Sequence, residues 1–142
     1  MTVAAVVLDN EPVQALLDPR HRWHRRVAAI LFEASGRNLR RPGGVRIIVP
    51  VAVRVEAGWD RSNPATANAN RIARPVDQHL DSAAADRAVQ LRRDTSVSVV
   101  DASVGHAFEI APQPAAVLTS DVEDMVRLRA ATRAPAVRIV AL

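Results

Sequence analysis

The sequence contains no cysteine and no lysine, and all 19 of its basic residues are arginine. The absence of cysteine excludes disulfides, thiolate metal sites and cysteine nucleophiles, and it suits a reducing compartment. The absence of lysine excludes Schiff bases, the lysine of a phosphate-binding P-loop and a lysine general base. Aromatic residues are only 3% of the chain. The catalytic groups that remain are chiefly carboxylates, together with any metal that they bind.

Long hydrophobic runs are also absent. No stretch approaches the roughly 18 to 20 apolar residues of a membrane span, and the first nine residues lack the basic region of a signal peptide. We therefore expect a cytoplasmic protein that does not enter a membrane. The 142 residues, 49% of them hydrophobic, match the size of one domain, so we expect a single domain over residues 1–142. Its apolar residues are mostly 26 alanines and 21 valines, which predicts a finely packed aliphatic core.

The charge is unevenly distributed along the chain. The formal net charge is +4, and the segment from Arg20 to Arg46 holds eight arginines but one acid, Glu33. A local field of this sign attracts phosphates or an acidic partner. The same arginines can equally form the solvated face of a helix.

Apolar runs alternate with amphipathic segments. Buried strands of a parallel sheet are predicted for residues 3–8, 45–49 and 115–119, and a last strand is predicted for residues 137–141. Helices are predicted for residues 11–17, 23–34, 63–73, 82–93 and 121–131, the second of them ending at Ser35-Gly36 before a loop at 40–44. This alternation predicts an α/β fold with right-handed crossovers.

Two segments are ambiguous from their residues alone. Residues 51–59 have the β-branched residues of a strand, but Pro50 suits the start of a helix. Residues 97–104 have the pattern of a strand interrupted by Asp101. A charge in such a run is costly unless it is paired, binds a metal or begins a helix.

Four acids occur where predicted strands end or inside apolar sequence. Asp9 and Asp121 follow strands, Glu56 lies about two helical turns after Pro50, and Asp101 interrupts its apolar run. Ligands of open parallel sheets collect at the carboxyl ends of the strands. Taken alone, Asp9 or Asp101 is explained about equally well as a helix cap, but the convergence of all four acids favours a hard cation. Oxygen ligands select Mg²⁺ or Mn²⁺ over Zn²⁺, and such a metal can activate water against a phosphodiester.

Together these segments resemble a known family. Val6-Val7-Leu8-Asp9, the run from Pro50 to Glu56, Asp101-Ala102-Ser103-Val104-Gly105 and Val117-Leu118-Thr119-Ser120-Asp121 are similar to the PIN domain, and within it to the VapC-type toxins of bacterial toxin–antitoxin pairs. The resemblance extends over the whole chain. It implies a PIN-like three-layer α/β/α sandwich with a central, mostly parallel sheet of four to five strands. It also implies a helix over residues 51–59 and another with Asp101 in its first turn.

The resemblance implies an Mg²⁺- or Mn²⁺-dependent endoribonuclease that is inhibited by a cognate antitoxin and forms a homodimer. By the same resemblance Asp9, Glu56 and Asp101 are metal ligands, and Asp121 is a fourth, more peripheral acid. Thr119 is then a hydrogen-bonding partner, and Asp124 an alternative acid whose simpler explanation is a first-turn helix charge. The Arg22, Arg25 and Arg26 side chains would contact RNA or the antitoxin.

One position departs from the family pattern. The family has a small hydroxyl residue after the first acid, whereas this chain has Asn10 followed by Glu11. Asn10 can still hydrogen-bond a carboxylate or a phosphate, and Glu11 either adds a fifth acid or, as we favour, stabilises the helix N-terminus. The four histidines have no motif spacing, so we expect no catalytic role for them.

Two other functions are compatible with parts of the sequence. A PIN-like module that binds RNA or protein without catalysis would explain Asn10. A phosphoaspartyl protein, either a receiver domain or a phosphatase, would also place an aspartate at a strand end. Both kinds of protein use a lysine, which this chain lacks. The phosphatases also use an Asp-x-Asp motif, whereas Asp9 is followed by Asn10 and Glu11.

Overall fold

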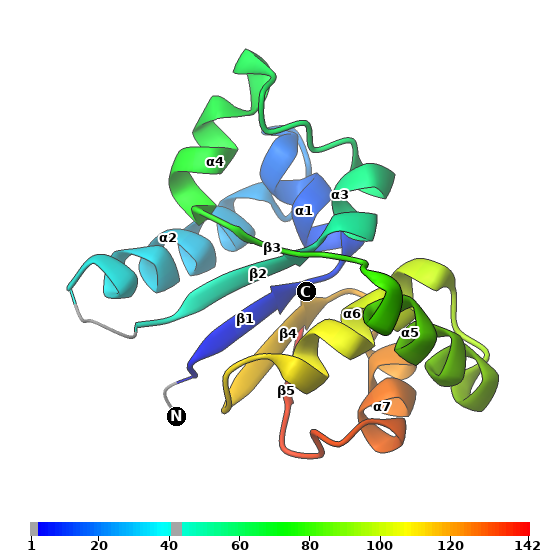
Figure 1. The fold of residues 1–142 in the computed structure, drawn as a ribbon. Helices are drawn as coiled ribbons and strands as arrows, with labels where there is room; N and C mark the ends of the chain where they lie inside the picture. The colour runs from blue at the N-terminus through cyan, green and yellow to red at the C-terminus, as the bar shows by residue number, and fades with distance from the viewer. Residues whose placement is uncertain (1–2, 41–43) are drawn as a thin grey trace.

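The computed structural model describes residues 3–40 and 44–142, which form a five-stranded sheet between two layers of helices (Figure 1). Every strand pairing is parallel, and the spatial order is β3-β2-β1-β4-β5. The central strand β1 is the fully buried run AVVL, which suits a position covered on both faces. The strands are β1 (Ala5–Leu8), β2 (Arg46–Pro50), β3 (Val76–Gln78), β4 (Ala115–Thr119) and β5 (Arg138–Ala141).

Helices cover both faces of this sheet. One layer contains α1 (Asn10–Leu17), α2 (His24–Arg40), α3 (Val51–Ala57), the short 3-10 helix η1 (Pro64–Thr66) and α4 (Ala67–Ala73), and the other contains α5 (Ser82–Thr95), α6 (Val99–Ile110) and α7 (Val122–Ala131) (Figure 1). The three-layer α/β/α sandwich predicted from the sequence is therefore confirmed. No helix in the described ranges has the length and apolar character needed to cross a bilayer.

The two ambiguous segments are helical. α3 begins directly after Pro50, which is both the last residue of β2 and the N-cap, and it ends at Gly58 with a φ of 73°. In α6 the Ser98 hydroxyl accepts a hydrogen bond from the backbone N–H of Asp101 at 3.0 Å. Asp101 therefore lies in the first turn of its helix, as expected.

Two elements differ from the predictions. β3 was not predicted, because a strand of three residues with one exposed and two half-buried positions has no recognisable hydrophobic period. The predicted end of α2 at Ser35-Gly36 is wrong, since the helix continues to Arg40. Ser35 is buried, so packing overrides the weak helix propensity of the pair. Of the loop predicted at 40–44, residues 41–43 lie outside the described residues.

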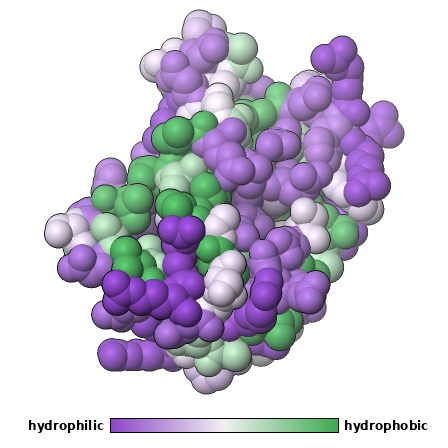
Figure 2. All heavy atoms as spheres, turned by 90° about the vertical axis from the view of Figure 1, so that its right-hand side faces the viewer, coloured by the Kyte–Doolittle hydropathy of each residue, from purple (hydrophilic) through white to green (hydrophobic). Residues whose placement is uncertain are grey.

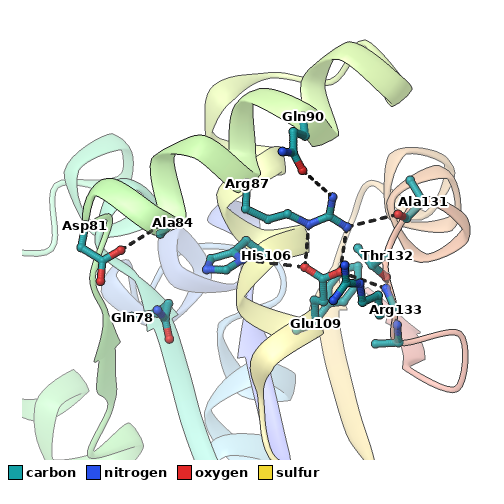
Figure 3. A network of polar contacts seen from close by, with 12 residues as sticks. Gln78, Asp81, Ala84, Arg87, Gln90, His106, Glu109, Ala131, Thr132 and Arg133 are labelled. Atoms are coloured by element: carbon teal, nitrogen blue, oxygen red, sulfur yellow. Dashed lines mark hydrogen bonds and ion pairs between the residues drawn. The ribbon is translucent and has the colours of Figure 1, made fainter.

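A partly buried ion pair connects the helices of the second layer. The Arg87 guanidinium of α5 donates two hydrogen bonds to the Glu109 carboxylate of α6, at 2.9 and 2.7 Å (Figure 3). The backbone N–H of Arg133, which follows α7, donates to the same carboxylate at 3.0 Å. One side chain of α6 thus connects three segments, and the Arg87 guanidinium holds the pKa of Glu109 below its ordinary value.

Candidate metal centre

The carboxyl end of β1 carries a buried aspartate. Asp9 is only 4% exposed, and its Oδ1 accepts the backbone N–H of Asn10 at 2.7 Å. Its Oδ2 accepts a hydrogen bond from the Thr119 hydroxyl, also at 2.7 Å, because β1 and β4 are neighbours that end at the same edge. The Thr119 oxygen in turn accepts the backbone N–H of Asp121 at 2.8 Å. This chain of hydrogen bonds fixes the Asp9 carboxylate at the edge of the sheet.

Three further carboxylates meet beside it. Asp101 lies in the first turn of α6, while Asp121 and Asp124 lie at the start of α7. One carboxylate oxygen from each of the three lies within 4.8 Å of the other two. The Asp121 carboxylate also caps α7 by accepting the backbone N–H of Asp124 at 3.2 Å. Several carboxylate oxygens at this spacing fit a hard divalent cation such as Mg²⁺ or Mn²⁺.

The electrostatics of these acids agree with such a fit. The pKa of Asp101 is raised to about 6, first by burial and then by the nearby charges of Asp9, Asp121 and Glu56, and this value includes the opposing effect of a hydrogen bond from Ser98. Burial also raises the pKa of Asp9, and this effect exceeds the lowering by the hydrogen bonds from Thr119 and Asn10. Neighbouring carboxylates therefore disfavour ionisation of Asp9 and Asp101, a repulsion that a bound cation would relieve.

The predicted site residues reach this edge to different degrees. Asp121, expected to be peripheral, belongs to the compact set, and so does Asp124. Glu56 is an exposed residue of α3 outside that set, and it acts on Asp101 only as the weakest of the causes of its raised pKa. Thr119 makes the hydrogen bond to Asp9 that was expected of it. The roles of these residues as ligands remain predictions.

The residues after Asp9 form a second polar group. Asn10 has a buried Oδ1 with no hydrogen-bond partner among the described residues. Glu11 lies in the first turn of α1 and pairs with His21 Nε2 at 2.9 Å. Because His21 Nδ1 accepts the backbone N–H of Trp23 at 3.1 Å, its Nε2 carries the proton that it donates to Glu11. No sequence signal marks this pair, whose members are ten residues apart.

Arginines flank the acidic edge. The guanidinium carbons of Arg22 and Arg26 lie 5.1 and 5.6 Å from the ring centroid of Trp23. Arg26 also donates to the backbone oxygen of Ala141 at 3.1 Å, and Ala141 is the β5 partner of Thr119. We call Arg22, Trp23 and Arg26 the Trp23 arginine cluster. Through Arg26 it contacts the end of β5, which lies beside the end of β4.

One arginine at the site itself was missed from the sequence. Arg127 forms an ion pair with Asp124, a member of the compact acidic set. The only sequence signal for it is the spacing of three residues on one helix, at which opposite charges meet.

An all-parallel α/β/α sandwich with acids at the carboxyl edge of its sheet is the arrangement expected of a PIN domain. No protein-family model matches the chain, and neither does any curated protein. Two solved structures are similar to it. One is the crystal structure of VapBC2 from Rickettsia felis bound to a DNA fragment from their promoter, with a TM-score of 0.56 and 12% identity over 97% of this chain and 98% of that chain.

The other is the structure of FitAB bound to the IR36 DNA fragment, with a TM-score of 0.55 and 12% identity over 96% of this chain and 94% of that chain. Likeness at this identity establishes the fold. The sequence resemblance to PIN domains of the VapC type is therefore confirmed at the level of the fold.

Proposed function

We propose that the protein is a metal-dependent endoribonuclease and the toxin of a toxin–antitoxin pair. The observation that carries this proposal is the convergence of the Asp101, Asp121 and Asp124 carboxylates within 4.8 Å, beside the buried Asp9. The site lies at the carboxyl edge of a fold shared with chains of the VapBC2 and FitAB complexes, which supports the same conclusion.

The residues at this site have different proposed roles. Asp101, Asp121 and Asp124 offer oxygens to Mg²⁺ or Mn²⁺, and Glu56 is proposed as a further ligand from α3. Asp9 is held in a single orientation by Thr119 and by the N–H of Asn10. A bound cation would lower the pKa of an attacking water and offset the charge that develops on the phosphodiester.

The RNA backbone is proposed to run over the Trp23 arginine cluster. Arg26 is fixed to the end of β5, and both Arg22 and Arg26 stack on the indole, so their guanidinium groups are partly ordered before RNA binds. Planar guanidinium groups match phosphate oxygens in a bidentate geometry. Arg25, exposed on the same helix, adds to the positive field.

Protein partners are part of the proposal. We propose a cognate antitoxin that inhibits the enzyme in the cytoplasm and a second copy of the chain that completes a homodimer. Figure 2, which views the molecule from the right-hand side of Figure 1, shows hydrophobic side chains gathered toward one half of that face, with hydrophilic ones over much of the other. Exposed valine and isoleucine side chains occur on all three helices of the second layer: Val89, Val99, Ile110, Val122 and Val126. A gathered apolar surface is typical of protein interfaces.

Cleavage of RNA by the purified protein tests the activity. After removal of any bound partner, the parent is expected to cleave single-stranded RNA in Mg²⁺ or Mn²⁺ and not in EDTA. The Asp101→Asn variant is expected to lose on the order of 100-fold in rate, because it removes a charged ligand. Absence of cleavage in either metal, or an equally active variant, contradicts the proposal.

A second function is favoured by one observation. Asn10 replaces the hydroxyl residue of the family pattern, and its buried Oδ1 lacks a partner in the described structure. A PIN-like module that binds RNA without cutting it would tolerate that change. RNA binding that is independent of metal and leads to no cleavage would support this alternative.

Growth measurements test the biological role. Induced expression of the protein alone is expected to stop bacterial growth, and co-expression with the product of a small adjacent reading frame is expected to restore it. Asp101→Asn is the matched control, since it should be harmless in either setting. Unaffected growth with the parent protein contradicts a toxin.

A further inference from the structure

Arg127 lies at the acidic site, and the chemistry proposed above assigns no role to it. It pairs with Asp124, whose side chain is only 19% exposed, while its own side chain is 51% exposed. Other arginines pair with carboxylates outside the compact set, including those of Asp18, Asp77 and Glu109. Arg127 thus places a positive charge where Asp101, Asp121 and Asp124 converge.

An arginine in this place can act in two ways. It can orient the Asp124 carboxylate as a ligand, or it can neutralise the acids when no cation is bound. A half-exposed pair on one helix turn holds its partner only weakly, because solvent competes and the long side chain keeps its rotamers. Its positive charge, in contrast, repels a divalent cation over several ångströms even in water. The geometry therefore favours neutralisation over orientation.

We propose that Arg127 is an internal counter-cation that exchanges partners. It neutralises Asp124 in the metal-free protein. When a divalent cation binds the three carboxylates, the guanidinium leaves Asp124 and contacts a phosphate of the nucleic acid at the same edge. The side chain is suited to this exchange because its charged end is half-exposed and its planar donors match phosphate oxygens. The inference rests on the metal-dependent nuclease proposed above.

Metal binding without RNA is the primary test. Free Mn²⁺ is measured by electron paramagnetic resonance during titration of the parent, Arg127→Gln and Arg127→Lys. Removal of the charge in Arg127→Gln is expected to lower the Mn²⁺ dissociation constant about three- to tenfold, and Arg127→Lys is expected to resemble the parent. The difference should shrink as salt is added, since ions screen the repulsion.

A matched control loses the same charge elsewhere. Arg138 is an exposed residue at the first position of β5, so it lies at the edge of the sheet opposite to Thr119 and the acids. Arg138→Gln is expected to bind Mn²⁺ as the parent does. An equal gain in affinity in this variant would show that net charge alone is responsible and would overturn the proposal.

RNA supplies the second readout. At saturating Mg²⁺, Arg127→Gln is expected to raise KM for single-stranded RNA and to reduce the slope of log affinity against log salt by about 0.7, the value for one phosphate contact. The expected signature of Arg127→Gln is tighter binding of Mn²⁺ together with weaker binding of RNA. Weaker or unchanged Mn²⁺ binding in Arg127→Gln overturns the exchange and leaves the nuclease proposal standing. A parent protein that binds no Mn²⁺ overturns both.

Discussion

At the scale of single residues, Thr119 joins the ends of two strands to the start of a helix. Its hydroxyl donates to Asp9 and accepts from the backbone N–H of Asp121, and the residue is fully buried. A valine has nearly the same shape but can make neither bond. Buried polar groups left without partners are costly, so this position should be sensitive to loss of the hydroxyl.

Thr119→Val is therefore expected to lower the free energy of unfolding by about 1–3 kcal/mol and to reduce RNA cleavage. Thr119→Ser keeps the hydroxyl and should cleave RNA at a rate closer to that of the parent. Urea unfolding and cleavage rates of the three proteins provide the comparison. A valine variant with parental stability would mean that the Asp9 carboxylate finds another donor.

The raised pKa of Asp101 predicts a dependence of stability on pH. Its folded pKa of about 6 exceeds the ordinary value of 3.8, so protonated Asp101 contributes stability that is fully present below pH 3.8 and is lost as the pH rises through 6. In EDTA, the parent should lose about 1–2 kcal/mol relative to Asp101→Asn between pH 4 and pH 7, less than the full pKa shift implies because solvent screens this half-buried group. Urea titrations at several pH values measure this difference. Added Mg²⁺ at pH 7 should stabilise the parent and leave the variant unchanged, and parallel pH curves would refute the assignment.

Sequence patterns locate the acids better than their partners. Asp9 and Asp121 follow buried strands, and parallel topology brings such positions to one edge. The pairing of Glu11 with His21 depends on how the linker between α1 and α2 turns back, which no periodicity records. Glu56 was placed by family resemblance, and the structure leaves it exposed outside the compact carboxylate set.

At the scale of elements, Gly105 of α6 lies directly against Leu128 of α7. A Cβ built on this residue would lie 2.8 Å from Leu128 Cδ2 and 3.4 Å from Leu128 Cβ. Leu128 is fully buried, so its side chain has little room to move away. The absent side chain at Gly105 therefore permits the helix packing that sets Asp101 beside Asp121.

Gly105→Ala is expected to destabilise the protein by about 1–2 kcal/mol, because overpacking outweighs the gain in helix propensity. The energetic coupling between residues 105 and 128 is measured by combining Gly105→Ala with Leu128→Ala, which removes the side chain that the new Cβ would contact. The double variant should be more stable than the sum of the single effects predicts. Strictly additive effects of the two substitutions would show that the contact with Leu128 is not the cause of the destabilisation by Gly105→Ala.

Element prediction succeeded where periodicity or burial was strong. The apolar runs around β1, β2 and β4 marked buried strands, and Asp81 marked the start of α5. α3 and α6 could not be assigned from their residues, because β-branched residues in a helix look like a strand when packing is unknown. The end of α2 depends on tertiary packing around buried Ser35, which local sequence does not encode.

At the scale of the whole molecule, the Trp23 arginine cluster lies at the same edge of the sheet as the acids. Positive charge at the Trp23 arginine cluster should make RNA binding strongly dependent on salt. Arg22→Gln/Arg26→Gln is expected to flatten the slope of log affinity against log salt by about 1.4, the value for two phosphate contacts on a single strand. Fluorescence anisotropy of a labelled RNA in Ca²⁺ measures this slope.

Arg20→Gln serves as the control, since its side chain is 93% exposed and pairs only with Asp18 among the described residues. It should leave the slope nearly unchanged. An unaltered slope in the double variant would place RNA elsewhere on the surface and would leave these arginines to a protein partner.

The hydrogen bond between Thr119 and Asp9 spans 110 positions of the chain. During synthesis β1 can pair with β2 early, but its other edge stays open until β4 has left the ribosome. The acidic site therefore has no complete form on a nascent chain shorter than about 124 residues, a length set by Asp124. The acids of this site are therefore brought together only when nearly the whole chain is available to fold.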